Sequence, residues 1–219
     1  MDKDKFCLVI GHGRSGTNLC GGLIDSNPEI NFGYEINNRD SNISVKPFPE
    51  KYNGNKVVIF PTYRVEFFLN CLLEKKCIVN SFHKKLFVVF TRRYAIDTMV
   101  SRFRRVRDKG QCPSYEQVFR EWMAVEQKIK EIKSYVDDYF EFDFDKALVS
   151  DSHVEEMFFY LGLEYNHGYY DDYRGTMNYT HAIGVGKHNV LMGKEGKFEE
   201  DRIIFKELWR EYESRSENH

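Results

Sequence analysis

Residues 5–28 read KFCLVIGHGRSGTNLCGGLIDSNP, and this stretch decides the fold. It begins with a short apolar run, Lys5 to Ile10, which is typical of a buried strand. A glycine-rich turn follows, and Asn18 to Ser26 then has the composition of a helix that ends at Asn27-Pro28. A strand, a glycine turn and a helix in this order predict the opening of an α/β nucleotide-binding domain.

Strands alternate with helices along the rest of the chain. The wholly apolar runs Val57–Phe60 and Leu86–Phe90 predict strands that are covered on both faces, as in a parallel sheet. Tyr139–Phe144 alternates apolar with acidic residues and predicts a further strand. We therefore expect residues 1–219 to form a single α/β domain of the P-loop type, with a mainly parallel sheet flanked by helices.

Helical patterns and polar segments fill the intervals between these strands. The predicted helices span Val65–Leu73, Ala95–Val106, Ser114 to about Tyr139, a stretch capped by Asp151 or Ser152 that ends near Leu161, and Phe198–Tyr212. The polar segments Asn37–Asn55 and Gly184–Lys197 predict loops. Repeats and domain linkers are absent from the sequence, which also favours one domain.

The composition is that of a globular protein and excludes several classes. Hydrophobic residues make up 42% and charged residues 30% of the 219 residues, which does not fit a disordered chain. The net charge of −2 gives no general attraction to nucleic acid or to an anionic membrane, so any anion site has to be local. The start, Met1 to Lys5, is charged, and no apolar run approaches the roughly 20 residues that span a bilayer.

The five cysteines favour a reducing compartment. Their number is odd, and their spacings fit neither a zinc site nor a CxxC motif. The histidines and carboxylates show no metal-ligand spacing either. We therefore expect a cytoplasmic protein without a disulfide framework and without a metal.

The turn Gly11–Thr17, GHGRSGT, has the placement of a phosphate-binding loop. Glycines let backbone N–H groups converge on an anion, and the positive end of the following helix adds to the attraction. Gly11 and Gly16 are separated as in the pattern GxxxxGK[ST], and Thr17 follows, but the lysine of that pattern is absent. A tight turn that binds no ligand is the alternative interpretation.

The stretch Gly13–Leu19, followed by Leu23-Ile24 and Asn27–Ile30, resembles the 5′-phosphosulfate loop of sulfotransferases that use 3′-phosphoadenosine 5′-phosphosulfate (PAPS). That family has a basic residue, then Ser-Gly-Thr, then a helix with an Asn-Pro or His-Pro stop. The resemblance implies that Arg14 neutralises charge on the leaving oxygen and that PAPS is used without a metal. It also implies that the 5′-phosphate is held by Gly13, Arg14, Ser15, Gly16, Thr17 and Asn18.

A second motif extends the resemblance. The family's 3′-phosphate site has an Arg after a strand and a Ser eight residues later, and Arg93 and Ser101 fall on these positions. The sequence departs from the family's usual Arg-Asp-Pro, because Tyr94 and Ala95 follow Arg93. Lys194 lies in a late glycine- and lysine-rich segment that resembles the loop closing over the 3′-phosphate. The likeness does not extend to residues 33–85, where an acceptor would be recognised.

The resemblance implies transfer of a sulfuryl group to an acceptor hydroxyl of a glycan, lipid, phenol or tyrosyl peptide. An alcohol holds its proton too tightly at neutral pH, so a general base is needed. Several branches of the family place a catalytic Glu soon after the first helix, where this chain has Glu35. His12 and His83 are the competing candidates.

Two other functions stay open. A P-loop nucleotide kinase or NTPase would need a loop lysine and a strand that ends in a Mg²⁺-binding Asp, and the sequence has neither. A catalytically inactive nucleotide-binding protein would carry the same two motifs. The basic run Arg102–Arg107 is more typical of a solvated helix face, or of a rim for an anionic glycan, than of an RNA site.

Overall fold

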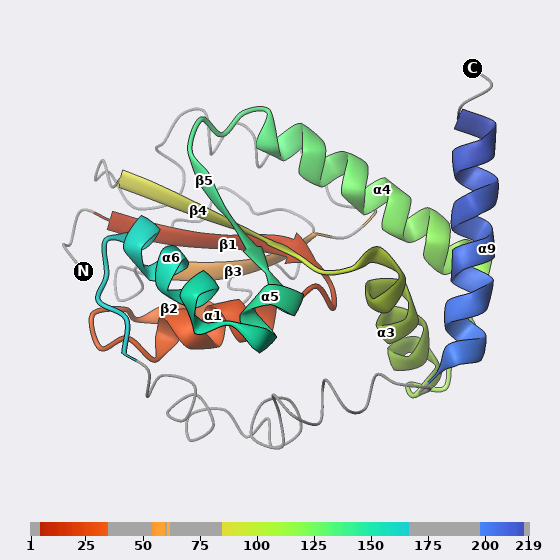
Figure 1. Cartoon of the computed structure of the whole chain (residues 1–219), viewed down its shortest axis with the longest axis horizontal. Helices are drawn as coiled ribbons and strands as arrows, with labels where there is room; N and C mark the ends of the chain where they lie inside the picture. The colour runs from red at the N-terminus through yellow and green to blue at the C-terminus, as the bar shows by residue number, and fades with distance from the viewer. Residues whose placement is uncertain (1–4, 35–53, 60, 62–84, 167–197, 217–219) are drawn as a thin grey trace.

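The computed structural model describes residues 5–34, 54–59, 61, 85–166 and 198–216, and it confirms the α/β class (Figure 1). Five strands form one sheet in the order β2-β3-β1-β4-β5, and every neighbouring pair is parallel. The strands are β1 Lys5–His12, β2 Phe32–Tyr34, β3 Gly54–Ile59, β4 Lys85–Arg92 and β5 Tyr139–Asp143. The first strand of the chain therefore lies at the centre of the sheet.

Helices cover both faces of this sheet, as the apolar strands require. On one face, Cys7 and Val9 of β1 pack against α1 Thr17–Asp25, α5 Phe144–Val149 and α6 Asp151–Leu161. On the other face, Leu8 and Ile10 pack against α4 Tyr115–Lys133. Successive side chains of β1 thus enter opposite cores, because side chains alternate along a strand.

A third apolar cluster joins three helices beyond the carboxyl edge of the sheet. It lies between α3 Ala95–Arg107, α4 and the last described helix, α9 Glu199–Ser216, which stands across the ends of the other two in Figure 1. Phe103 stacks on Tyr115, and Phe205 meets both rings edge-on.

Two buried carboxylates fix α9 to α3. Asp201 accepts from the Arg104 guanidinium, with 2.5 Å between Arg104 Nη2 and Asp201 Oδ2, and from the Tyr115 hydroxyl at 2.7 Å. Arg202 Nη2 lies 2.6 Å from Asp97 Oδ1. The first turn of α9 is thereby tied to both the first and the last turn of α3. In the part of the chain described, no helix is long and apolar enough to cross a membrane.

The predicted boundaries needed several corrections. The strand β2 was not predicted, because three residues at a sheet edge carry too little pattern. The long helix was predicted to about Tyr139 but ends at Lys133, where Ser134 caps it. Phe144 belongs to α5 and not to a strand, because the Asp143 side chain accepts from the backbone N–H groups of Asp145 and Lys146 and starts a helix there.

Two smaller boundaries also differ. The N-cap of α6 is Ser150, which makes no side-chain capping bond, and neither Asp151 nor Ser152 holds that position. Gly54 and Asn55 lie in β3 and not in the predicted loop. The Ser114 cap is confirmed, since its hydroxyl accepts from the Gln117 N–H at 3.1 Å. The predicted helix Val65–Leu73, the rest of the first loop and the segment Gly184–Lys197 lie outside the described residues.

Candidate functional site

The glycine turn lies between β1 and α1, at the carboxyl edge of the sheet, where ligands bind in folds of this kind. Ser15 holds the turn together from inside. Its hydroxyl donates to the His12 carbonyl at 2.9 Å and lies 2.7 Å from the Thr91 hydroxyl, and its N–H donates to the same carbonyl at 3.2 Å. A β-carbon at Gly11 would lie only 2.0 Å from Thr91 Oγ1, so glycine is required there.

The turn enters α1 through two residues with left-handed backbone angles. Arg14 has φ 80° and Gly16, the N-cap, has φ 97°. Gly16 also packs so closely on Phe144 that a β-carbon would lie 2.5 Å from that ring. Gly16 has no side chain to cap α1, and the N–H groups of the first turn lie at the positive end of the helix. Such a turn, here called the cradle, has the backbone arrangement that suits an anion.

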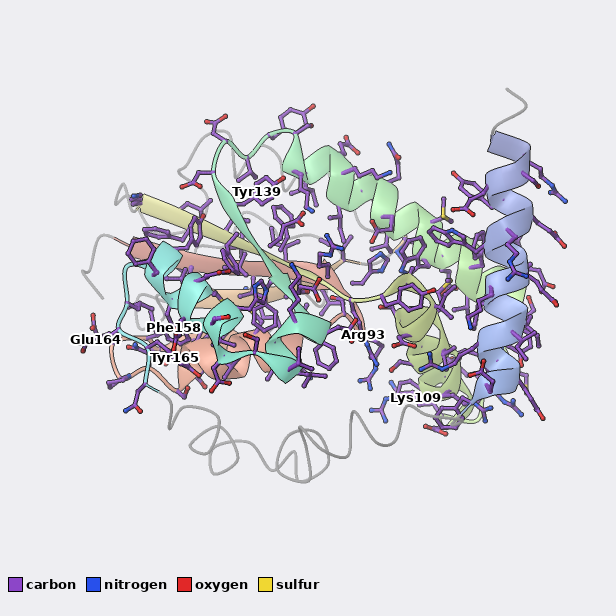
Figure 2. The ribbon with its side chains drawn as sticks, viewed as in Figure 1. Arg93, Lys109, Tyr139, Phe158, Glu164 and Tyr165 are labelled. Atoms are coloured by element: carbon purple, nitrogen blue, oxygen red, sulfur yellow. The ribbon has the colours of Figure 1, made fainter. Side chains whose placement is uncertain are left out.

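The two predicted anion motifs lie side by side. Arg14 Nε donates to the Ser101 hydroxyl of α3 at 3.0 Å. Arg93, which follows β4, donates through Nη1 to the Arg14 carbonyl at 3.5 Å. Figure 2 shows Arg93 in the space between α5 and α3. Residues separated by 79 and 87 positions in the sequence thus form one basic group beside the cradle.

Arg93 is held without full hydrogen bonding. Its guanidinium lies 4.8 Å from the centre of the Phe144 ring, a cation–π distance. Its Nε atom is buried and has no hydrogen-bond partner among the described residues. Burial lowers the pKa of this guanidinium, and the nearby carboxylates of Asp97 and Asp145 oppose that shift. An anion bound here would supply the partner that Nε lacks.

Lys56 is a site residue that the sequence did not reveal. It is 4% exposed in β3, and its ammonium donates to the Asn18 side chain at the start of α1. Val57 and Ile59 of the same strand lie in the core on the α4 face. Because side chains alternate along a strand, Lys56 lies on the opposite face, beside α1. The signal was a lysine within an otherwise buried strand, where charged residues are rare.

His12 ends β1 and points to the opposite face, toward α4. Its ring stacks on Trp122 with centroids 5.4 Å apart and planes 5° from parallel. Glu126 Oε1 lies 3.0 Å from His12 Nε2, although the two groups are not aligned for a hydrogen bond. The other residues predicted for the site, Glu35, Lys194 and His83, lie outside the described residues.

Two pockets open at the carboxyl edge of the sheet. The first, here the β1–β3 pocket, has a volume of about 40 Å³ and is lined by His12, Gly13, Ile59, Pro61, Thr98, Met99, Arg102, Val118, Glu121, Trp122 and Val125. The second, the β4–β5 pocket, has about 580 Å³, and its lining includes Thr91, Arg93, Tyr94, Trp122, Glu126, Glu141 and Lys146. Trp122 lines both pockets.

No group of three or more His, Cys, Asp or Glu side chains that would suit a metal ion occurs within the described ranges. The anion site described above consists of N–H groups, guanidinium groups and hydroxyls. Its chemistry suits phosphate or sulfate groups.

Comparisons with known proteins find similarity among solved structures and none among sequences. No protein-family model matches this chain, and no curated protein sequence matches it. Among solved structures, the chain is similar to mouse sulfotransferase SULT7A1 complexed with PAP. The two share 15% sequence identity with a TM-score of 0.49, over 81% of this chain and 65% of that chain. This chain thus spans just under two thirds of the length of that chain.

Proposed function

We propose that this protein is a sulfotransferase that transfers a sulfuryl group from PAPS to an acceptor hydroxyl of a glycan, lipid, phenol or tyrosyl peptide. The observation that carries the proposal is the contact between the two anion motifs, in which Arg14 donates to Ser101 at 3.0 Å. A nucleotide with a phosphosulfate on one side of its ribose and a phosphate on the other needs two anion sites side by side. A nucleoside triphosphate carries all its charge in one chain and needs only the first.

The residues around the turn fit such a nucleotide. The backbone N–H groups at Gly13, Gly16, Thr17 and Asn18 would hold the 5′-phosphate, while Ser15 keeps the turn in shape through its bonds to His12 and Thr91. The 3′-phosphate would lie against Arg93 and Ser101, where Arg93 Nε has no hydrogen-bond partner in the described part of the chain. Lys194 would close over the same phosphate.

PAPS supplies a sulfuryl group that is already activated by its bond to phosphate. As the acceptor oxygen bonds to sulfur, the bond from sulfur to the phosphate oxygen breaks, and its electron pair stays on that oxygen. Arg14 would offset the negative charge that develops there. A base would take the hydroxyl proton, and the family resemblance favours Glu35 for this role over His12 and His83.

A P-loop kinase or NTPase is the second candidate, and Lys56 is the observation in its favour. Its ammonium at Asn18 brings a cation close to the cradle, where the usual lysine of the loop is missing. Against this function, neither neighbour of β1 ends in a carboxylate that would bind Mg²⁺, since β3 ends at Ile59 and β4 at Arg92. A catalytically inactive binding protein differs from the enzyme only in turnover.

Calorimetric titration separates these functions. We expect 3′-phosphoadenosine 5′-phosphate (PAP), the desulfated product, to bind at micromolar affinity or better without a divalent metal. ATP with Mg²⁺ should bind much more weakly, because Arg93 and Ser101 would have no second phosphate to hold. Equal or tighter binding of ATP would contradict the sulfotransferase proposal.

A further inference from the structure

His12 has an unusual position for a residue of the sheet. It is the last residue of β1 and only 6% exposed, and it lies within the glycine turn, directly before Gly13. Ile10, two residues earlier, packs in the core on the α4 side, so His12 faces that side too. The imidazole therefore lies behind the anion cradle, on the face of the sheet opposite α1.

Two residues of α4 fix this imidazole. Trp122 stacks on the ring, and Glu126 Oε1 lies 3.0 Å from Nε2. Trp122 and Glu126 are four positions apart, so they lie on one face of the helix. The stacking fixes the ring plane, and the carboxylate lies within reach of Nε2, although the two groups are not aligned for a hydrogen bond.

The histidine and the carboxylate face different pockets. His12 and Gly13 line the β1–β3 pocket of about 40 Å³, which has room for a hydroxyl and its neighbouring atoms, or for roughly three waters. Glu126 lines the β4–β5 pocket of about 580 Å³. The side chain of Glu126 is 33% exposed and that of His12 only 8%. Their contact therefore joins a residue that lines the small pocket to a more exposed residue that lines the large one.

We propose that the acceptor hydroxyl enters the β1–β3 pocket and that His12 accepts its proton, with Glu126 as the positioning residue that passes the proton to solvent in the β4–β5 pocket. The inference rests on the proposed sulfotransferase function. The acceptor oxygen bonds to the sulfur of PAPS, the bond from sulfur to the 5′-phosphate oxygen breaks, and PAP leaves with that electron pair. The hydroxyl proton moves to His12 and then by way of Glu126 to water.

The other charges near His12 are already paired or lie on the cradle side. Glu121 and Arg102 both line the β1–β3 pocket and lie 3.6 Å from each other. Arg14 in the turn is exposed and donates to Ser101. Glu126 is thus the carboxylate that the described structure places beside the imidazole.

The test compares three variants, His12→Asn, Glu126→Gln and Glu35→Gln, with Glu131→Gln as a matched control on an exposed turn of α4. PAP binding is measured first, by calorimetry. Turnover of PAPS is then measured with 2-naphthol, a tyrosyl peptide and glucosamine glycans as acceptors, and with water as the acceptor if none of these reacts. His12→Asn should keep wild-type PAP affinity and lose about 10²–10⁴-fold in kcat, the usual contribution of a general base.

Glu126→Gln distinguishes a role of Glu126 in proton transfer from a purely structural role. If Glu126 carries the proton onward during turnover, its removal should lower kcat while the KM for the acceptor and the Kd for PAP stay near the wild-type values. Glu131→Gln should leave all three unchanged.

The outcomes separate this inference from the function on which it rests. Failure of the wild-type protein to bind PAP would overturn both. PAP binding with full turnover in His12→Asn, or a wild-type kcat in Glu126→Gln, would overturn the inference alone. Loss of turnover confined to Glu35→Gln would assign the base to Glu35 and would also overturn it.

Discussion

Arg14 Nε donates a hydrogen bond to the Ser101 hydroxyl at 3.0 Å, between residues 87 positions apart in the sequence. Arg14 belongs to the turn that precedes α1, and Ser101 belongs to α3, which follows β4. Because β1 and β4 are parallel neighbours, their carboxyl ends lie together, and so do the segments that follow them. The contact makes one basic site out of two motifs.

The first prediction concerns the 3′-phosphate site. Arg93→Ala and Ser101→Ala should each weaken PAP binding by about 1.5–3 kcal/mol, the usual value of a hydrogen bond to a charged group. This corresponds to roughly tenfold or more in Kd, measured by calorimetry. Arg105→Ala is the control, because it removes an exposed charge from α3, the helix that carries Ser101. This variant should bind PAP as the wild type does. Unchanged affinity in both test variants would show that the 3′-phosphate lies elsewhere.

The second prediction concerns the close approach of β1 and β4 beneath the turn. Gly11→Ala would place a β-carbon 2.0 Å from Thr91 Oγ1 and 2.8 Å from Ser15 Oγ, so the turn has to shift. We expect a loss of about 1–3 kcal/mol in the free energy of unfolding, as for overpacked sites. Gly13→Ala is the control, because its β-carbon would meet Val58 at an ordinary 3.5 Å. Urea unfolding of the two variants should differ, and equal stabilities would contradict the packing described.

The third prediction concerns the attachment of α9. Asp201→Asn removes the charge that Arg104 pairs with, and its carboxylate is 2% exposed. We expect the free energy of unfolding to fall by about 1–3 kcal/mol, the cost of leaving a buried polar group poorly paired. The hydrogen bond to Asp201 is also the main reason that the pKa of Tyr115 is raised, so that pKa should fall in the variant.

Chemical denaturation measures the change in stability, and ultraviolet titration of the tyrosines measures the change in pKa. Glu200→Gln, an exposed neighbour on α9, is the matched control and should change neither quantity. A variant Asp201→Asn with wild-type stability would mean that the pairing of Asp201 with Arg104 does not stabilise the attachment of α9.

The fourth prediction concerns alkaline pH. Burial raises the pKa of Tyr160 from 10.0 to about 12, while its hydroxyl accepts from the Val88 N–H and donates to the Asp138 carbonyl. Above pH 10 the unfolded chain loses this proton before the folded protein does. The raised pKa of Tyr160 therefore contributes to the stability of the folded protein fully below pH 10, and this contribution is lost as the pH rises toward 12.

Tyr160→Phe should accordingly show a shallower loss of stability between pH 10 and 12 than the wild type. Thermal unfolding across this range checks the prediction. Tyr212→Phe, at an exposed tyrosine, serves as the control and should follow the wild-type slope. Identical slopes in all three proteins would show that Tyr160 ionises equally easily in the folded and unfolded chain.

Local patterns in the sequence predicted most of the fold. The apolar runs before Gly11 and Thr91 predicted two central strands, and the Ser114 cap predicted the start of α4. Such signals are carried by residues close together in the chain, so no tertiary information is needed to interpret them. The three-residue strand β2 and the short helix α5 were missed, because neither is long enough to show a period.

The arrangement of the site depended on contacts that no local pattern contains. The sequence by itself determined that a glycine turn with Arg14 opens the first helix, and that Arg93 and Ser101 follow a buried strand. Only the tertiary structure placed Ser101 against Arg14, Lys56 against Asn18, and Glu126 beside His12. The physical reason is that a parallel sheet brings together the carboxyl ends of strands far apart in the chain, and the helices packed on its two faces decide which side chains meet there.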